Sequence, residues 1–278
     1  MPLTSQPACN VCLPVLSNRE IVPEIFLLAL EEPRLAALAR PGQFMMLSIP
    51  PLMDPLLPRP FAVFNTEGSR FEILYKRVGK GTALLAQMRE GDVLRVLGPL
   101  GNGFSPPDRS VEALVLAGGI GIASLHFLLV HLLKGDCAPP TLLYGVRSPE
   151  ELVPLEPLEN SGLLLHIATE DGKRGVKGRV SDLLSTVLEQ GKGLSRADTE
   201  AFVCGPLPML KAVAKQMTTL GIKSQFSLES RMACGYGVCQ GCVIPFKDEK
   251  EPKSILYRKV CTDGPVFPVE DICWEAIR

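Results

Sequence analysis

The stretch Cys234-Gly-Tyr-Gly-Val-Cys239-Gln-Gly-Cys242 separates three cysteines by four and then by two residues. Three thiolates at this spacing reach a 2Fe-2S cluster from one tight turn, and a distant fourth cysteine closes the site. The glycines between them let the backbone fold around the cluster and point N–H groups at its sulfurs. We therefore interpret this stretch as the main part of a 2Fe-2S site.

The alternative is a structural four-cysteine zinc site, but such sites usually pair one C-x2-C with another, and no second pair follows nearby. Spacing alone leaves the fourth ligand open, because Cys261 and Cys273 are both within reach of a loop. Cys9 and Cys12 form a lone C-x2-C, which we interpret as ordinary strand or loop residues. Cys137 is expected in a turn or in the core.

Length and composition set the wider frame. The 278 residues predict about two domains. Lys and Arg number 29 against 30 Asp and Glu, so no net field attracts nucleic acid or an anionic membrane. Nine cysteines are too few, and odd in number, for a disulfide scaffold. The first residues lack the basic and apolar parts of a secretory signal, so we expect a cytoplasmic protein with reduced thiols.

One apolar run invites a membrane interpretation. Ala113–Leu133 carries no Asp, Glu, Lys or Arg and is long enough to cross a bilayer as a single helix. However, Gly118, Gly119 and Gly121 break the run near its middle. A buried strand, a glycine turn and a buried helix fit better, and we predict no membrane partner.

Three compositional zones follow. Residues 1–106 contain short apolar runs between turn signals and predict an antiparallel barrel, with one helix over Ala83–Met88 that Thr82 caps and Gly91 ends. Residues 107–225 alternate strand and helix, which predicts a parallel sheet covered by helices on both faces. Residues 226–278 are short, Cys-rich and without periodicity, so we expect something other than an apolar core to organise them.

The expected strands of the first zone are Ile21–Leu30, Gln43–Ile49, Phe61–Asn65, Phe71–Val78 and Asp92–Leu97. Those of the second are Leu114–Ala117, Thr141–Tyr144, Leu163–Ala168 and Ala201–Cys204, and its helices are Ser124–Leu133, Val180–Leu188 and Met209–Leu220.

Glycines and one arginine mark candidate phosphate sites. Gly81 and Thr82 place N–H groups at a helix N-terminus, a natural seat for a pyrophosphate, although a plain turn would look identical. Arg59 offers a fork of donors to a phosphate, and the strand Arg59–Ala62 could face a planar ring. By itself, that strand reads equally as an edge strand with a solvated arginine.

Two strand-to-helix turns are candidates for a dinucleotide. Gly118–Gly121 departs from the strict G-x-G-x-x-G/A pattern, because Ser124 occupies the last place and no acidic residue stands about twenty positions on. Its glycines still allow close backbone approach. Cys204-Gly205-Pro206 repeats the strand, turn and helix start, and Cys204 is either a buried thiol or a ligand contact.

Taken in order, these segments resemble the ferredoxin-reductase superfamily and, within it, the electron-transfer subunits of B-type dihydroorotate dehydrogenases. The most specific of them are Glu229–Cys234 and Val260–Phe267. The others are Pro41–Phe44, Arg59–Ala62, Ile73–Tyr75, Gly79–Thr82, Leu97–Phe104, Gly118–Gly121, Thr169–Gly172 and Cys204–Pro206.

The resemblance implies FAD, a 2Fe-2S cluster and NAD as cofactors, with Cys261 as the fourth cluster ligand. It implies FAD contacts at Arg59, Pro60, Phe61, Ala62, Leu74, Tyr75, Lys76, Gly81 and Thr82. It implies nicotinamide-side contacts at Gly118, Gly119, Ile120, Gly121, Cys204, Gly205 and Pro206. The partner would be an FMN-containing dihydroorotate dehydrogenase catalytic subunit, two of each subunit forming a heterotetramer in pyrimidine biosynthesis. Since cofactors carry the difficult chemistry, we expect no general acid–base residue in this chain.

One departure is Ala62, where the superfamily commonly has Ser or Thr beside the flavin, so a hydroxyl hydrogen bond is lost. Other interpretations are a reductase subunit of a hydrogenase, sulfide dehydrogenase or transhydrogenase, and a redox-sensing or structural protein whose cysteines bind zinc. The choice between NAD and NADP also stays open, because Arg147 either meets a 2′-phosphate or is simply solvated; the resemblance favours NAD.

Overall fold

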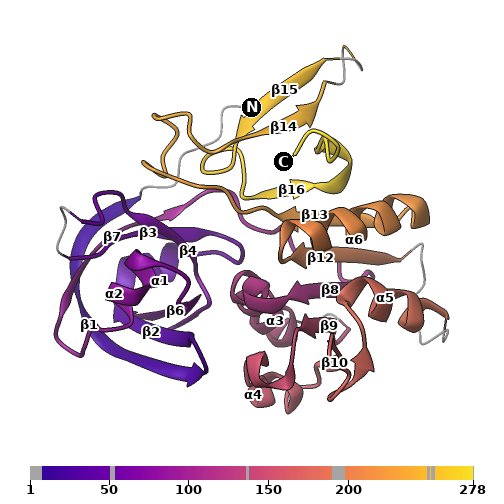
Figure 1. Cartoon of the computed structure of the whole chain (residues 1–278), viewed down its shortest axis with the longest axis horizontal. Coiled ribbons are helices and arrows are strands. Elements are labelled where there is room, and N and C mark those ends of the chain that lie inside the picture. Colours follow the sequence, from indigo (N-terminus) through magenta and orange to yellow (C-terminus); the bar gives the residue numbers. More distant parts are fainter. Residues whose placement is uncertain are drawn as a thin grey trace.

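The computed structural model describes residues 8–50, 54–135, 138–189, 198–248, 251 and 254–277. Cys137, expected in a turn or in the core, lies outside them. An antiparallel barrel lies beside a parallel sheet, and a C-terminal hairpin projects from them (Figure 1). This architecture confirms the predicted fold class.

The first zone forms one antiparallel sheet, which wraps into a barrel (Figure 1). In spatial order, the strands seen in the described residues are β4 (Arg59–Ala62), β3 (Phe44–Ser48), β7 (Val93–Leu100), β1 (Cys9–Val22), β2 (Ile25–Glu31), β6 (Arg70–Lys76) and β5 (Asn65–Glu67). Strands β1 and β7 alternate apolar and polar residues over part of their length, because one face of each packs into the barrel core.

Two short helices accompany the barrel. Helix α1 (Pro33–Leu38) was not expected; Pro33 begins it, and the Glu32 carboxylate accepts a hydrogen bond from the Leu35 N–H. Helix α2 (Lys80–Leu85) begins earlier than expected, so the prediction of Thr82 as its N-cap is wrong. Thr82 Oγ1 instead accepts from the N–H groups of Val78 and Gly79 at 2.9 and 3.1 Å, which closes the preceding turn.

The second zone forms a sheet whose strands run parallel, as predicted, except at one edge, where a strand of the C-terminal zone pairs antiparallel with its neighbour. Its strand order, within the described ranges, is β11 (Val176–Lys177), β10 (Leu164–Thr169), β9 (Thr141–Val146), β8 (Glu112–Gly118), β12 (Thr199–Cys204), β13 (Lys223–Ser227) and β16 (Val266–Pro268). Helices α3 (Ile122–Lys134), α4 (Glu156–Glu159), α5 (Val180–Glu189) and α6 (Leu207–Leu220) surround it, with short 3-10 turns at Gly119–Gly121, Pro149–Glu151 and Val269–Asp271.

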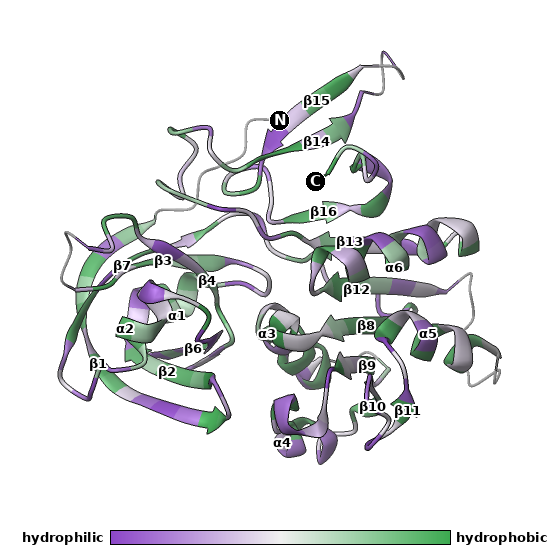
Figure 2. Ribbon diagram, viewed as in Figure 1, coloured by the Kyte–Doolittle hydropathy of each residue, from purple (hydrophilic) through white to green (hydrophobic). Residues whose placement is uncertain are grey.

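The central strand β8 is buried on both faces, which is why Ala113–Ala117 is continuously apolar (Figure 2). Val115 packs with α3 on one face, whereas Leu114 and Leu116 pack with α5 and α6 on the other. The run Ala113–Leu133 thus becomes strand β8, a turn and helix α3, as predicted. In the part of the chain that the structure describes, no helix is both long and apolar enough to cross a membrane.

The C-terminal zone carries the hairpin β14 (Val243–Lys247) and β15 (Ile255–Lys259). The expectation that it lacks an apolar core is wrong: Phe246 and Phe267 are fully buried, with ring centroids 4.7 Å apart. They join the core of α6 and β13. Periodicity did not reveal this core because its residues come from short segments. Strand β13 also crosses the expected boundary at residue 225, and β16 pairs with it, so the zone is continuous with the parallel sheet.

Candidate functional site

Four cysteine thiols meet at the edge of the barrel, in two pairs. The Cys239 N–H donates to Cys234 Sγ at 3.5 Å, and the Cys261 N–H donates to Cys242 Sγ at 3.4 Å. The thiols within each pair also interact: that of Cys239 with Cys234, and that of Cys261 with Cys242. The structure therefore pairs the four cysteines expected to hold the cluster, and Cys234 lies near enough to Cys261 to raise the pKa of its thiol. Cys273 lies elsewhere, with its N–H donated to the carbonyl of Pro245 at 3.1 Å.

The loop backbone favours a thiolate at Cys234. Burial raises the pKa of this thiol, but N–H groups of Cys239, Tyr236 and Val238 and the Cys239 thiol together lower it to about 6. Burial, followed by the Cys242 thiol, raises the pKa of Cys261 to about 12. Crowded thiols of this kind lose their protons when a metal supplies positive charge.

A cluster of two irons fits this arrangement, because each iron of a Cys-ligated 2Fe-2S centre takes two cysteines. Among the described side chains, no three His, Cys, Asp or Glu gather closely enough to hold one metal ion. Two pairs of thiols thus match the donor set of a two-iron cluster. Gly235 fixes the loop against the barrel: its φ is +82°, and a Cβ there would lie 2.5 Å from Cγ of Met46.

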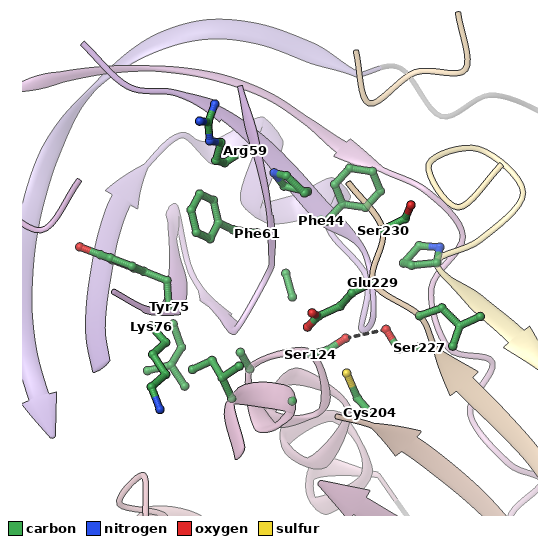
Figure 3. Close-up of a pocket in the computed structure, with 18 of the residues that line it drawn as sticks. Phe44, Arg59, Phe61, Tyr75, Lys76, Ser124, Cys204, Ser227, Glu229 and Ser230 are labelled. Carbon is green, nitrogen blue, oxygen red and sulfur yellow. Dashed lines mark hydrogen bonds between the residues drawn. The ribbon is translucent and has the colours of Figure 1, made fainter. Parts of the chain in front are cut away.

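A cavity of about 410 Å³ lies between the barrel and the parallel sheet (Figure 3). Strands β4 and β6 form one wall, and the turn before α3 together with the segment after β13 forms the other. Met232, two residues before Cys234, belongs to the lining, so the cavity reaches the cysteine loop. The predicted residues on its wall are Arg59, Pro60, Phe61, Ala62, Leu74, Tyr75, Lys76, Thr82, Ile120, Gly121 and Cys204.

Arg59 lies on the cavity wall, and its guanidinium is beside Gly81 at the start of α2. A Cβ at Gly81 would lie 3.0 Å from Arg59 Nε, so a larger residue there would push the guanidinium aside. The guanidinium fork and the N–H groups of the first turn of α2 thus face the same region, which suits a pyrophosphate. Tyr75 contributes mainly backbone, since its ring packs on Phe26 and its hydroxyl donates to Asn18 Oδ1 at 3.0 Å.

Ser124, Ser227 and Glu229, which were not predicted, lie near the predicted Cys204 on the wall of this cavity (Figure 3). The hydroxyls of Ser124 and Ser227 are 3.1 Å apart and buried. Burial raises the pKa of the Cys204 thiol to about 12, so this thiol stays neutral. The Glu229 carboxyl is surrounded by protein but still reached by solvent through the cavity, and desolvation raises its pKa. Ser227, Ser230 and Met232 also line the wall without having been expected.

A second cavity, of about 540 Å³, lies beyond the carboxyl ends of β8, β9 and β12. Its wall includes the predicted Gly118, Gly119, Ile120 and Pro206, and Lys76 borders both cavities. Arg147, Glu151, Glu170 and Arg179 also line it. The carboxyl end of a parallel sheet is where such folds bind dinucleotides. Glu170 was not predicted, although it directly follows β10 and residues at the carboxyl ends of parallel strands are expected near the ligand.

The two predicted glycine turns pack against each other. A Cβ at Gly121 would lie 2.4 Å from the carbonyl oxygen of Cys204, and one at Gly205 would lie 2.8 Å from Met209. Gly119 is different: its φ is +52° and open space surrounds it. Gly205 and Gly121 thus let the turns approach, whereas Gly119 gives the backbone its shape.

The barrel, the parallel sheet, the two cavities and the paired cysteines beside the first cavity define a class: ferredoxin-reductase-type oxidoreductases, which bind a flavin, a dinucleotide and an iron–sulfur cluster. Residues 115–215 match the oxidoreductase NAD-binding domain. Residues 229–273 match the iron-sulfur cluster binding domain of dihydroorotate dehydrogenase B.

The chain belongs to the family of dihydroorotate dehydrogenase B (NAD(+)) electron transfer subunits. It is 32% identical to the Desulforamulus reducens subunit, over 94% of this chain and 97% of that one. It is 36% identical to the Caldanaerobacter subterraneus subunit, over 93% and 96%. Membership confirms the predicted family and its class, an NAD-linked oxidoreductase subunit with FAD and a 2Fe-2S cluster.

Solved structures agree on the fold. The structure of an NADH-dependent reduced ferredoxin-NADP oxidoreductase superimposes with a TM-score of 0.81 at 25% identity, covering 98% of this chain and 92% of that one. A ferredoxin reductase of carbazole 1,9a-dioxygenase superimposes with a TM-score of 0.67 at 22% identity, covering 78% and 68%. The second likeness concerns the fold alone.

Proposed function

We propose that this chain carries electrons between a catalytic subunit that oxidises dihydroorotate at FMN and NAD⁺, in a complex with two copies of each subunit. The observation that supports this most is the contact between the cysteine loop and the cavity wall. Gly235 packs on Met46 of β3, and Met46 pairs with Pro60 of β4, which lines the cavity. One strand pair thus separates the candidate cluster site from the candidate flavin site.

The chain's own residues would hold the cofactors. Cys234, Cys239, Cys242 and Cys261 would hold the cluster. Arg59 with the start of α2 would hold the pyrophosphate of FAD, and the backbone of β4 and β6 would face its ring. When bound, FAD exchanges hydride with NAD and single electrons with the cluster. Ala62 offers no hydroxyl there, so Ser124 and Glu229 supply the polar side chains at the nicotinamide side.

The partner would approach the cysteine loop. Cys239 is exposed, and several large apolar side chains in this loop and in the following hairpin face solvent. Large exposed apolar groups of this kind mark protein interfaces. We name those of the loop and of one face of the hairpin the docking surface: Tyr236, Val238, Val243, Ile255 and Tyr257.

The test is to co-express the chain with an FMN-containing dihydroorotate-oxidising subunit, purify the complex and measure NADH formation from dihydroorotate and NAD⁺. Cys239→Ser should abolish this reaction while NADH still reduces the bound FAD. Cys12→Ser, at an exposed thiol on the barrel, is the matched control and should change neither. Light scattering of the complex gives its stoichiometry.

The proposal fails if the purified chain contains neither flavin nor iron, or if Cys239→Ser leaves electron delivery intact. Co-purification with a hydrogenase, sulfide dehydrogenase or transhydrogenase subunit, and no turnover of dihydroorotate, would favour those alternatives instead.

A further inference from the structure

Glu151, in the 3-10 turn after β9, binds cations from two parts of the chain. Its Oε1 accepts from Nζ of Lys76, on the barrel, at 3.0 Å and also from Nη2 of Arg147. Its Oε2 accepts from Nε of Arg147 at 3.4 Å. The Glu151 side chain is 19% exposed, whereas that of Arg147 is 70% exposed. The Glu151 carboxylate is thus largely enclosed by protein, whereas the Arg147 guanidinium lies at the surface of the second cavity.

Both arginines of this cavity have a carboxylate partner. Arg147 is the first residue after β9 and is paired with Glu151. Arg179 Nε lies 3.4 Å from Oε1 of Glu170, the first residue after β10. All four line the cavity into which the glycine turn of β8 also opens. The Arg147 hydrogen bond, the largest favourable effect, lowers the pKa of Glu151, so this residue is an anion at neutral pH.

NADP carries a 2′-phosphate where NAD carries a 2′-hydroxyl, and these two groups need different partners in the second cavity. A 2′-phosphate is a dianion, and its best partner is a free guanidinium fork that donates two hydrogen bonds. In this chain the carboxylate of Glu151 already occupies that fork and adds a negative charge beside it. A 2′-hydroxyl needs no cation and meets no such repulsion.

We propose that Glu151 is the specificity-determining residue that makes this subunit select NAD over NADP, by engaging the Arg147 guanidinium that would otherwise bind a 2′-phosphate. This inference rests on the proposed function, since it takes the second cavity as the site of the adenosine half. Glu151 would thus disfavour NADP by pairing with Arg147, and it would not add a contact that favours NAD.

The experiment measures equilibrium binding of 5′-AMP and of 2′,5′-ADP to the FAD-loaded subunit by calorimetry. These probes differ only in the 2′-phosphate. Glu151→Gln should tighten binding of 2′,5′-ADP by about tenfold or more and change binding of 5′-AMP by less than about twofold. The KM for NADPH in reduction of the bound FAD should fall in parallel. Glu159→Gln, which removes the same charge from exposed helix α4, is the matched control and should leave both affinities unchanged.

The double variant Arg147→Gln/Glu151→Gln tests whether Arg147 causes the tighter binding of 2′,5′-ADP. It should return 2′,5′-ADP affinity to the wild-type value. A gain that persists in the double variant would assign the phosphate to another cation, such as Lys76, and would overturn the proposal. Unchanged 2′,5′-ADP affinity in both Glu151→Gln and Glu151→Ala, with flavin content and melting temperature retained, would also overturn it. Failure of the wild type to bind 5′-AMP or NADH at all would instead count against the dinucleotide site of the proposed function.

Discussion

The backbone N–H of Cys261 donates to Sγ of Cys242 at 3.4 Å, although the two residues are 19 positions apart. Cys273, the other cysteine within reach by spacing, donates its N–H to the Pro245 carbonyl instead. We therefore expect Cys261→Ser to lose most of the about two irons per chain and the visible absorbance of the cluster. Cys273→Ser should retain both. Iron analysis with absorption spectra of the purified variants checks this, and the reverse pattern would reassign the fourth ligand.

The apolar core of the C-terminal zone should be measurable in stability. Phe246 is fully buried between the Phe267 ring and the Arg258 guanidinium, which lies 4.9 Å from its centroid. Phe246→Ala should therefore cost about 3–5 kcal/mol of unfolding free energy. Tyr257→Ala, on the adjacent strand but 67% exposed, should stay within about 0.5 kcal/mol of wild type. Urea unfolding followed by circular dichroism measures both.

Equal stability of these two variants would mean that the metal cluster, and not apolar packing, holds this zone together. Since urea also releases cofactors, visible absorbance should be recorded in the same titration. Coincident transitions would support a single cooperative unit.

The docking surface gives a prediction about the partner. A charge at Val238 or Tyr257, which are 70% and 67% exposed, should weaken binding of the catalytic subunit by about tenfold or more without affecting folding. The reason is that the charge would be desolvated when the partner covers it. Val238→Glu and Tyr257→Glu are the variants, and Leu164→Glu on β10, 55% exposed, is the control. Calorimetric titration with the catalytic subunit distinguishes them, and equal weakening by all three would refute the surface.

His126 predicts part of the pH dependence of stability. Its ring stacks on Phe64 with centroids 3.8 Å apart, and its Nδ1 lies 3.1 Å from the Phe64 carbonyl oxygen. Burial lowers the pKa of His126 to about 4. Because the unfolded chain protonates this group near pH 6.5, the stability is complete above that pH and is lost progressively as the pH falls toward 4.

Between pH 7 and pH 5.5, this residue should remove about 1 kcal/mol from the unfolding free energy. The wild type and His131→Gln, at an exposed position of α3, should show this loss, whereas His126→Gln should not. Urea titrations at the two pH values give the comparison. The same pH dependence in all three proteins would show that His126 does not contribute.

Sequence reasoning succeeded where local spacing carries the information. The run Ala113–Leu133 was assigned correctly as strand, turn and helix, because glycines interrupt helices and both flanks are uncharged. The cysteine stretch from Cys234 to Cys242 indicated its own metal site, because a tight turn brings nearby thiols together without help from the rest of the chain. The short helix at Pro33 was missed, because six residues give too little periodicity to recognise.

Contacts between distant segments were beyond such reasoning. Thr82 was expected as the N-cap of a helix, but Gly79 is the N-cap, and the Thr82 hydroxyl accepts from the N–H groups of Gly79 and Val78, which depends on where the backbone before the helix lies. Glu229 lines the cavity only because β13 ends beside the turn of α3. The interdomain pair between Lys76 and Glu151 joins residues 75 positions apart, and neither has a local signal.

By itself, then, the amino-acid sequence determined the succession of barrel, parallel sheet and cysteine loop, since hydrophobic period, glycine position and thiol spacing are local properties. Only the tertiary structure decided that Cys261 meets Cys242, that Phe246 and Phe267 give the last zone a core, and that Glu151 engages Arg147. These contacts depend on how separately formed elements pack, and packing brings together side chains whose distance along the chain carries no information about their distance in space.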